Sequence, residues 1–192
     1  TDRRGGYMST TIVCCNTRKY HGLMVAPIDQ SDRTYVLLSS LDETLIQHDQ
    51  AFNLALHRYD GVYEPRGHKY ITDFEYTPTP TITYRVGGAI LRKELLWIHK
   101  RTQLMIRYTL VDAHSETTLR LRPLLAFRDK HALSKANMEA DGRAYPIPFG
   151  VKCRLYDGFP WLYMQLNKED SEFIAAPDWY YNIEYQKELR RG

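Results

Sequence analysis

The sequence predicts a mainly β protein, an antiparallel β-sandwich with a short C-terminal helix. Three observations support this fold class. Runs of β-branched and apolar residues recur along the chain and are separated by turn residues. Two pairs of these runs enclose Gly-Gly or Asp-Gly, dipeptides that two-residue hairpin turns prefer. Other runs alternate apolar and polar residues, as half-buried strands do.

The first half of the chain contains three apolar runs followed by one hairpin signal. Residues 8–15, 23–26 and 34–41 are rich in β-branched or apolar side chains and are predicted to be core strands. Gly87-Gly88 then separates the runs 81–86 and 89–98. Since such a dipeptide favours a tight turn, we expect these two runs to form a β-hairpin.

The second half carries the alternating runs and a second hairpin signal. Residues 105–110 and 118–122 alternate, so one face of their sheet should contact solvent. Asp157-Gly158 separates the runs 151–156 and 159–166 and predicts another hairpin. Residues 128–150 contain Asp-Gly and Pro-Ile-Pro and are predicted to form a long loop, a part of β-sandwiches that often carries binding surfaces.

A helix is predicted only at the end of the chain. Pro177-Asp178 precedes a polar, periodic stretch over residues 179–191, which has a basic last turn and is followed by Gly192. A cap residue, basic C-terminal residues and a terminal glycine are typical helix boundaries. Tyr181, Tyr185 and Leu189 would lie on one face of this helix.

Length and charge limit the protein classes. The chain has 192 residues, which fits a single domain over residues 1–192. Its net charge of +3 comes from 26 basic and 23 acidic residues that are intermixed, so no basic stripe for nucleic acid is expected. No apolar run reaches the roughly 20 residues of a membrane span, and no membrane partner is expected.

Cysteine usage and the chain start indicate the cellular context. Cys14 and Cys15 are adjacent, which leaves only Cys153 as a distant partner and argues against a disulfide framework. The first residues lack the pattern of a secretory signal, so a cytoplasmic location is expected. The chain also lacks an initiator methionine, which suggests a piece of a longer protein.

The segment Asn16-Thr17-Arg18-Lys19-Tyr20-His21-Gly22 concentrates polar recognition groups. Asn, Arg and His form directional hydrogen bonds, and tyrosine offers a flat apolar face with a polar tip. This combination suits sugars, which present hydroxyls and an apolar ring face. The alternative is structural: Arg18 and His21 would be satisfied polar residues at a strand junction, and Gly22 would allow a close backbone approach.

No metal, cofactor or catalytic site is predicted. The seven histidines lack metal-ligand spacing, and the chain contains no Gly-x-Ser-x-Gly motif or phosphate-binding loop. Carboxylates occur at Asp42, Glu43, Asp73, Glu75 and Asp129. The sequence does not show which two, if any, lie at the separation that glycoside hydrolysis requires, so no acid/base pair is assigned.

Four ordered blocks of sequence resemble a known family. They are Gly5-Gly6-Tyr7-Met8-Ser9-Thr10-Thr11 with the segment Asn16 to Leu23, then Leu37-Leu38-Ser39-Ser40-Leu41-Asp42-Glu43, Pro123 to His131, and Pro177 to Tyr185. Together they resemble the N-terminal domain of bacterial and archaeal glycogen debranching enzymes, across nearly the whole chain. Cys14-Cys15 replaces the small residues expected at that place.

The resemblance implies a supersandwich-like β-sandwich that precedes a catalytic (α/α)-barrel, which is absent here. The parent enzyme would be an amylo-α-1,6-glucosidase of glycogen catabolism, a glycoside hydrolase that removes α-1,6-linked glucose branches with one carboxylic acid and one water-activating carboxylate. Both carboxylates would belong to the barrel. The implied partners of this chain are an α-glucan, either glycogen or a malto-oligosaccharide, and the C-terminal catalytic domain of the same chain.

Within that role, the candidate substrate-binding residues are Arg18, Tyr20, His21, Arg128 and Asp129. The arginines can donate paired hydrogen bonds to sugar hydroxyls or to a carboxylate of the neighbouring domain, and Tyr20 can stack on a pyranose ring. The alternatives are core packing for Tyr20 and an ion pair at a loop base for Arg128 and Asp129.

Three function classes remain open at this point. The chain is a non-catalytic domain of a debranching enzyme that helps to bind or orient glucan, an autonomous carbohydrate-binding β-sandwich, or a structural scaffold between domains. An autonomous module would bind malto-oligosaccharides unaided. A scaffold would bind none and would expose an interdomain surface.

Overall fold

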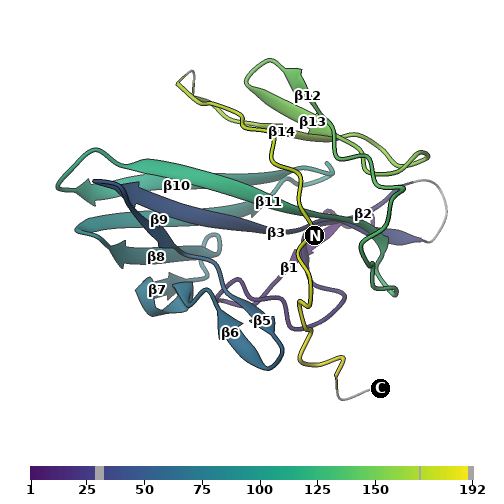
Figure 1. Ribbon diagram of the computed structural model, residues 1–192, viewed down its shortest axis with the longest axis horizontal. Helices are drawn as coiled ribbons and strands as arrows, with labels where there is room; N and C mark the ends of the chain where they lie inside the picture. The colour runs from purple at the N-terminus through teal and green to yellow at the C-terminus, as the bar shows by residue number, and fades with distance from the viewer. Residues whose placement is uncertain (29–32, 169, 190–192) are drawn as a thin grey trace.

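Two large antiparallel β-sheets form the body of the molecule (Figure 1) in the computed structural model, which describes residues 1–28, 33–168 and 170–189. The first sheet has the strand order β1-β2-β3-β11, and β4 pairs with the far end of β3. Its strands are β1 (Tyr7–Ser9), β2 (Gly22–Pro27), β3 (Thr34–Gln47), β4 (Gln50–Asn53) and β11 (Thr118–Asp129).

The second large sheet and two small sheets complete the architecture. The second sheet has the order β10-β9-β8-β7, and the small sheets have the orders β12-β13-β14 and β5-β6. Their strands are β5 (His57–Tyr59), β6 (Val62–Glu64), β7 (Ile71–Glu75), β8 (Thr81–Val86), β9 (Ala89–Trp97), β10 (Leu104–Ala113), β12 (Ala144–Ile147), β13 (Gly150–Cys153) and β14 (Leu162–Gln165). A 3₁₀ helix, η1 (Gly67–Tyr70), precedes β7.

Apolar side chains between the two large sheets form the main core. Leu45 of β3 packs there with residues of β8 and β9, including Ile82, Tyr84 and Leu91. A second cluster lies on the opposite side of β3, where Leu38 packs with residues of β13 and β14. Apolar burial on both faces explains the long buried run of β3. The predicted mainly β, antiparallel sandwich is therefore confirmed.

The predicted core strands are confirmed at two places and wrong at one. Residues 23–26 lie within β2, and residues 34–41 open β3, which continues to Gln47. The run 8–15 is a strand only to Ser9. After Ser9 the chain turns, because Thr11 bonds through its hydroxyl to the backbone of Cys15 and Cys14 adopts a left-handed conformation with φ of 55°.

The first hairpin prediction is confirmed. Gly87 and Gly88 have φ values of 59° and 79°, and the flanking strands β8 and β9 pair directly across them. Such a turn needs left-handed conformations at both central positions, which glycine adopts without strain. The alternation predicted for residues 105–110 is confirmed as far as Thr109, because Met105, Arg107 and Thr109 of β10 are exposed, but Leu110 is exposed as well.

The second hairpin prediction is correct in its pairing and wrong in its turn. β13 and β14 pair, but Cys153 faces Leu162, so residues 154–161 form the connection. This connection is long because Phe159 packs its ring against Phe127 and Tyr35. The predicted loop 128–150 is likewise partly wrong, since its end forms the edge strand β12 beside β13.

The predicted C-terminal helix over residues 179–191 is wrong in its described part, and residues 190–192 lie outside the described residues. Ile183 forms a β-bridge with Tyr59, and Asn182 has φ of 61°. Glu184 donates its backbone N–H to the carbonyl of Arg58 at 2.8 Å, and its carboxylate forms an ion pair with the Arg58 guanidinium at 3.0 Å. Residues 183 and 184 therefore bond to β5, and only a turn follows, in which Glu188 and Leu189 donate their backbone N–H groups to the carbonyl of Tyr185.

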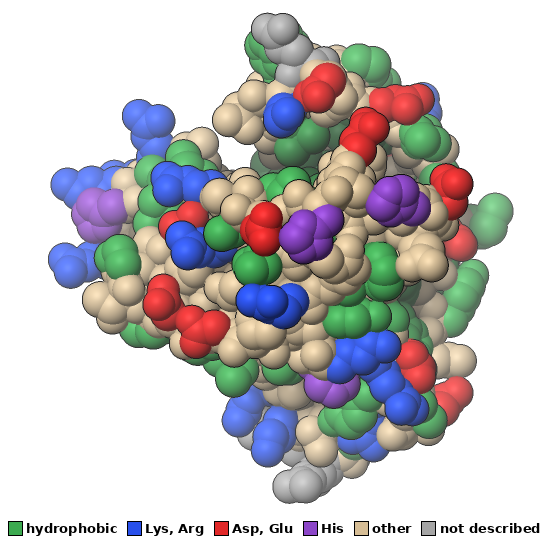
Figure 2. Space-filling model, turned by 90° about the vertical axis from the view of Figure 1, so that its left-hand side faces the viewer, with side chains coloured by type: hydrophobic (Ala, Val, Ile, Leu, Met, Phe, Trp, Pro, Cys, Tyr) green, Lys and Arg blue, Asp and Glu red, His purple; other side chains and the backbone are tan. Residues whose placement is uncertain are grey.

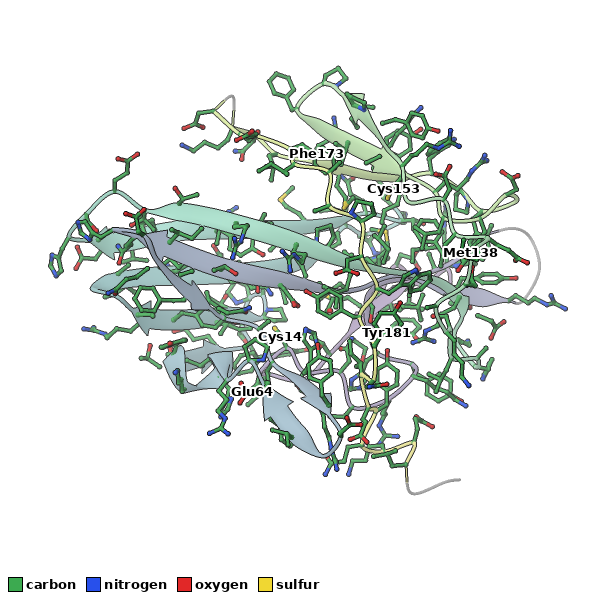
Figure 3. All side chains as sticks on the ribbon, viewed as in Figure 1. Cys14, Glu64, Met138, Cys153, Phe173 and Tyr181 are labelled. Carbon is green, nitrogen blue, oxygen red and sulfur yellow. The ribbon has the colours of Figure 1, made fainter. Side chains whose placement is uncertain are left out.

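The cysteines and surface charges can be followed in the figures. Cys14, Cys15 and Cys153 are free thiols, and Figure 3 shows Cys14 and Cys153 on opposite sides of β3. Side chains of both charge signs are spread over the face in Figure 2. Within the part of the chain that the structure describes, no helix has the length and apolar character needed to cross a membrane.

Candidate functional site

The polar segment Asn16 to Gly22 forms a loop that leads into β2, and hydrogen bonds hold its first end to the sheet. The Asn16 amide donates to the carbonyl of Ser39 on β3 at 2.9 Å and accepts from the Thr10 hydroxyl at 2.9 Å. At the other end, a Cβ on Gly22 would lie 2.8 Å from a methyl group of Val36. Gly22 therefore marks the close backbone approach considered from the sequence, and the loop sits directly on the first sheet.

Arg128, at the end of β11, joins this loop to two other segments. Its guanidinium donates to the carbonyl of Lys19 at 2.7 Å and to the carbonyls of Ala132 at 2.8 Å and Asp129 at 3.3 Å. It also lies 5.8 Å from the ring centre of Tyr185 in the C-terminal segment. Arg128 is only 7% exposed, so most of its donors are committed inside the protein.

An irregularity in β11 aims Arg128 at the loop. The pairing of β11 with β3 shifts register between Leu125 and Arg128, and Phe127 has φ of 45°. A left-handed conformation is unfavourable for a bulky aromatic residue, and bulges often redirect side chains beside functional sites. Burial of the Phe127 ring against Phe159 holds this conformation in place.

Tyr20 and His131 meet on the outer side of this arrangement. The Tyr20 hydroxyl lies 3.3 Å from His131 Nδ1, and the two rings are in edge contact at 5.4 Å. Asp129 orients His131 by accepting its backbone N–H at 2.7 Å. Arg128 donates to the backbone carbonyl of Asp129 and not to its carboxylate. The structure therefore does not show the ion pair between these two residues that the sequence left open.

His21 and Arg18 occupy the remaining side of the loop. His21 Nδ1 accepts the backbone N–H of Thr17 at 3.2 Å, which requires that nitrogen to be unprotonated. Burial and the nearby Arg18 charge lower the pKa of His21. Arg18 is exposed, and its guanidinium makes no hydrogen bond or ion pair with the residues that the structure describes. We call Arg18, Tyr20, His21 and His131 the loop surface.

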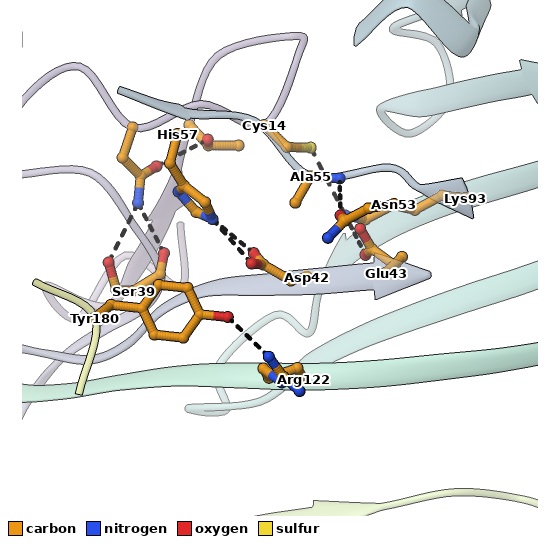
Figure 4. Close-up of polar contacts among 12 residues, drawn as sticks. Cys14, Ser39, Asp42, Glu43, Asn53, Ala55, His57, Lys93, Arg122 and Tyr180 are labelled. Atoms are coloured by element: carbon orange, nitrogen blue, oxygen red, sulfur yellow. Dashed lines mark hydrogen bonds and ion pairs between the residues drawn. The ribbon is translucent and has the colours of Figure 1, made fainter. Parts of the chain in front are cut away.

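The carboxylates of β3 are engaged inside the protein (Figure 4). Asp42 accepts from His57 Nε2 at 2.9 Å on one side of the strand. Glu43 faces the other side, where it pairs with Lys93 Nζ at 2.6 Å and accepts from the Tyr108 hydroxyl at 2.5 Å. Asp42 is 6% exposed and Glu43 is 2% exposed, so neither side chain is open to a substrate.

The ionisation of Lys93 and Tyr108 reflects their burial. Burial disfavours the ammonium form of Lys93, but the neighbouring Cys14 and Glu43 outweigh burial and raise the pKa of Lys93 well above its usual value. Burial and the Glu43 charge raise the pKa of the Tyr108 phenol in the same way. The cluster therefore keeps a charged lysine and a neutral phenol around the Glu43 carboxylate.

The structure brings together all five residues singled out in the sequence, and it adds residues that sequence reasoning missed. His131 contacts Tyr20, and Tyr185 covers Arg128. His131 lies three positions after Arg128, so its proximity was readable from the sequence. The sequence predicts Tyr185 in a helix, whereas the structure places it in a non-helical segment, where its ring covers Arg128.

These features define a β-sandwich domain whose polar surface is carried by loops and whose central carboxylates are buried and paired. The chain belongs to the family described as glycogen debranching enzyme N terminal, whose family model matches residues 1–192. Glycogen debranching enzymes are glycoside hydrolases. Comparisons with curated proteins and with solved structures gave no match for this chain.

Proposed function

We propose that residues 1–192 form a single, non-catalytic N-terminal domain of a glycogen debranching enzyme that helps to bind and orient branched α-glucan. The observation that carries this proposal is the family match over the whole chain. We place the glucan contact on the loop surface, with Arg128 and Asp129 as the residues that support it. The parent enzyme would act as an amylo-α-1,6-glucosidase in glycogen catabolism.

The geometry of the loop surface supports a role in sugar contact. Arg18 has an exposed guanidinium whose donors are free to bond to adjacent hydroxyls. Tyr20 is half-buried and supplies an aromatic face, while His21 and His131 add ring nitrogens beside it. A sugar needs this mixture of donors, acceptors and a flat apolar surface.

The buried state of the β3 carboxylates supports a non-catalytic role. Inverting hydrolysis needs two carboxyl groups that reach the substrate, one to protonate the leaving oxygen and one to activate water. Asp42 and Glu43 are instead paired with His57 and Lys93. We therefore assign the chemistry to a C-terminal (α/α)-barrel of the same protein, against which this domain would pack.

The support that Arg128 gives to the loop favours a second role, as a scaffold toward the catalytic domain. The Arg128 side chain donates hydrogen bonds to the loop and to the 129–132 turn and lies over the Tyr185 ring of the C-terminal segment, so the three segments keep a fixed arrangement. Such an arrangement could equally present a rigid face to a neighbouring domain. The three free thiols support a cytoplasmic location for the protein.

Calorimetric titration tests the proposal. The chain is titrated with linear and α-1,6-branched malto-oligosaccharides, and the same is done with Arg18→Ala, Arg128→Lys and the control Arg120→Ala, an exposed arginine elsewhere on β11. We expect saturable binding. Arg18→Ala should raise the dissociation constant about tenfold, because it removes roughly one hydrogen bond to a charged group. Arg128→Lys should weaken it too, because lysine cannot hold three carbonyls in fixed geometry.

Two results would contradict the proposal. If Arg18→Ala and Arg120→Ala reduce binding equally, the loop surface is not the place of sugar contact. No heat of binding at millimolar sugar, with wild-type chain that is folded by its NMR spectrum, would leave the scaffold role as the function of this surface.

A further inference from the structure

A hollow on the small three-stranded sheet lies outside the loop surface. It has a volume of about 500 Å³, within the usual range for small-molecule sites. Side chains of β12, β13 and the 154–161 connection line it, among them Tyr145, Lys152 and Trp161. Figure 1 shows β12, β13 and β14 together on one side of the β3 and β11 strands.

Two aromatic rings meet at a right angle in this hollow. Tyr145 and Trp161 are in edge contact with ring centres 5.4 Å apart and an interplanar angle of 89°. Lys152 stands opposite Tyr145 in the strand pairing, and its ammonium lies 4.8 Å from the Trp161 ring centre. The Arg154 guanidinium lies 4.7 Å from the same ring. Both aromatic residues are half-buried, so their rings are held in place and still reach solvent.

The charges of the hollow balance. Its lining contains three cationic side chains, Arg143, Lys152 and Arg154, and three carboxylates, Glu139, Asp141 and Asp157.

Arg143 binds Asp141 through two nitrogens, with a shortest distance of 2.8 Å, and Arg154 binds Asp157 at 3.0 Å. Lys152 makes no ion pair with any residue that the structure describes. A site for phosphate or another anion would need an excess of positive charge. The balanced set instead offers donors and acceptors side by side to a neutral ligand.

We propose that this hollow is a second sugar-binding site, which takes a segment of a neutral α-glucan chain. A glucose ring would stack on the Trp161 ring, over which the Lys152 ammonium lies, with Tyr145 beside it, and the paired Arg143 and Asp141 would bond to its hydroxyls. Lys152 is the group that moves aside, because its ammonium has no ion-pair partner to lose. The choice of α-glucan over another neutral sugar rests on the proposed function, whereas the site itself rests on the geometry above.

A second site would change how the domain meets a branched polymer. The hollow and the loop surface share no residue, so two chains of one glucan could be held at once. Binding at one site raises the effective concentration of the attached chain at the other. The hollow would therefore hold an outer chain of the glucan while the loop surface contacts another part of the same molecule.

NMR of the tryptophan indole groups tests the proposal on the whole 192-residue chain. Comparison with the Trp161→Phe spectrum assigns the Trp161 signal, and Trp179 serves as the internal control because it does not line the hollow. The chain is titrated with maltoheptaose, with the β-linked cellohexaose and with inorganic phosphate. Arg143→Gln removes one exposed guanidinium without touching the core, and Arg18→Ala perturbs only the loop surface.

We expect maltoheptaose to shift the Trp161 signal saturably, with little effect on Trp179. Arg143→Gln should raise the dissociation constant measured at Trp161 about tenfold, and Arg18→Ala should leave it unchanged. A Trp161 signal that responds to phosphate and not to maltoheptaose overturns the proposal in favour of an anion site. An equal response to cellohexaose overturns the assignment to α-glucan.

The same titrations separate this inference from the proposed function. Sugar binding that Arg18→Ala weakens, with no change at Trp161, overturns the second site and leaves the loop surface standing. Binding that only Arg143→Gln weakens supports the second site and removes the loop surface. No response to any sugar at millimolar concentration overturns both.

Discussion

Replacing Lys93 by methionine should destabilise the protein strongly, because it leaves the Glu43 carboxylate buried without its cation. The side chains of Lys93 and Glu43 are 1% and 3% exposed, and their charged atoms are 2.6 Å apart. Removing one partner of a buried pair costs about 3–5 kcal/mol. With a urea m-value of about 2 kcal/mol/M, the unfolding midpoint should fall by about 2 M. The Tyr108 hydroxyl still bonds to Glu43 and keeps the loss near the lower end.

The double variant Glu43→Leu with Lys93→Met provides the decisive comparison. It removes both charges and fills their space with apolar groups, so it should cost less than either single change. The control Lys135→Met replaces an exposed loop lysine and should change stability by less than about 0.5 kcal/mol. The reasoning fails if Lys93→Met costs less than about 1 kcal/mol, or if the two single losses simply add in the double variant.

Three further perturbations test other parts of the structure. Burial raises the pKa of Tyr108, so the folded protein keeps a proton that the unfolded protein loses above about pH 10. The free energy of unfolding should therefore fall as pH rises past that value. Urea midpoints should show a less steep fall in the Tyr108→Phe variant. Burial and Arg18 lower the pKa of His21, so Arg18→Gln should raise the His21 pKa in an NMR titration, and an unchanged or lower value would contradict the assignment. A Cβ on Gly67 would lie 2.0 Å from backbone atoms of Leu54, so Gly67→Ala should lower the free energy of unfolding, measured with urea, by at least about 3 kcal/mol. Gly158 has open space around it and a φ of +84°, so the control Gly158→Ala should lower it by only about 1–2 kcal/mol.

The sequence predicted those hairpins and strands whose signals are local. Gly87-Gly88 specifies its own turn, and the alternation in β10 follows directly from a sheet with one solvated face. The turn at His48-Asp49 between β3 and β4 was missed, although both residues adopt left-handed conformations there. Neither is glycine, and the pairing of β4 with β3 imposes a conformation that local preference does not favour.

The C-terminal segment shows where local signals are overruled. Residues 179–189 carry helical capping and periodicity, but Ile183 bridges Tyr59 and Glu184 binds Arg58. A short, marginal helix gives little stability of its own, so contacts with β5 decide its conformation. Nothing within the segment itself indicates this partner.

The candidate site was predictable as a set of residue types and not as a geometry. The sequence placed Arg18 and Arg128 in the same role, but the structure separates an exposed side chain from one whose donors hold three carbonyls. The Trp161 hollow was not predicted, because Tyr145 and Lys152 become neighbours only through the pairing of β12 with β13. Long-range pairing of this kind leaves no local signal.

The most direct test of the central claim is whether the wild-type chain recognises α-glucan at all. A two-dimensional NMR titration with an α-1,6-branched malto-oligosaccharide reports binding and its location in one experiment. The account predicts saturable shifts at Arg18, Tyr20 and His21, with weaker or no shifts for cellohexaose. Spectra that stay unchanged at millimolar branched sugar would contradict a glucan-binding role for this domain.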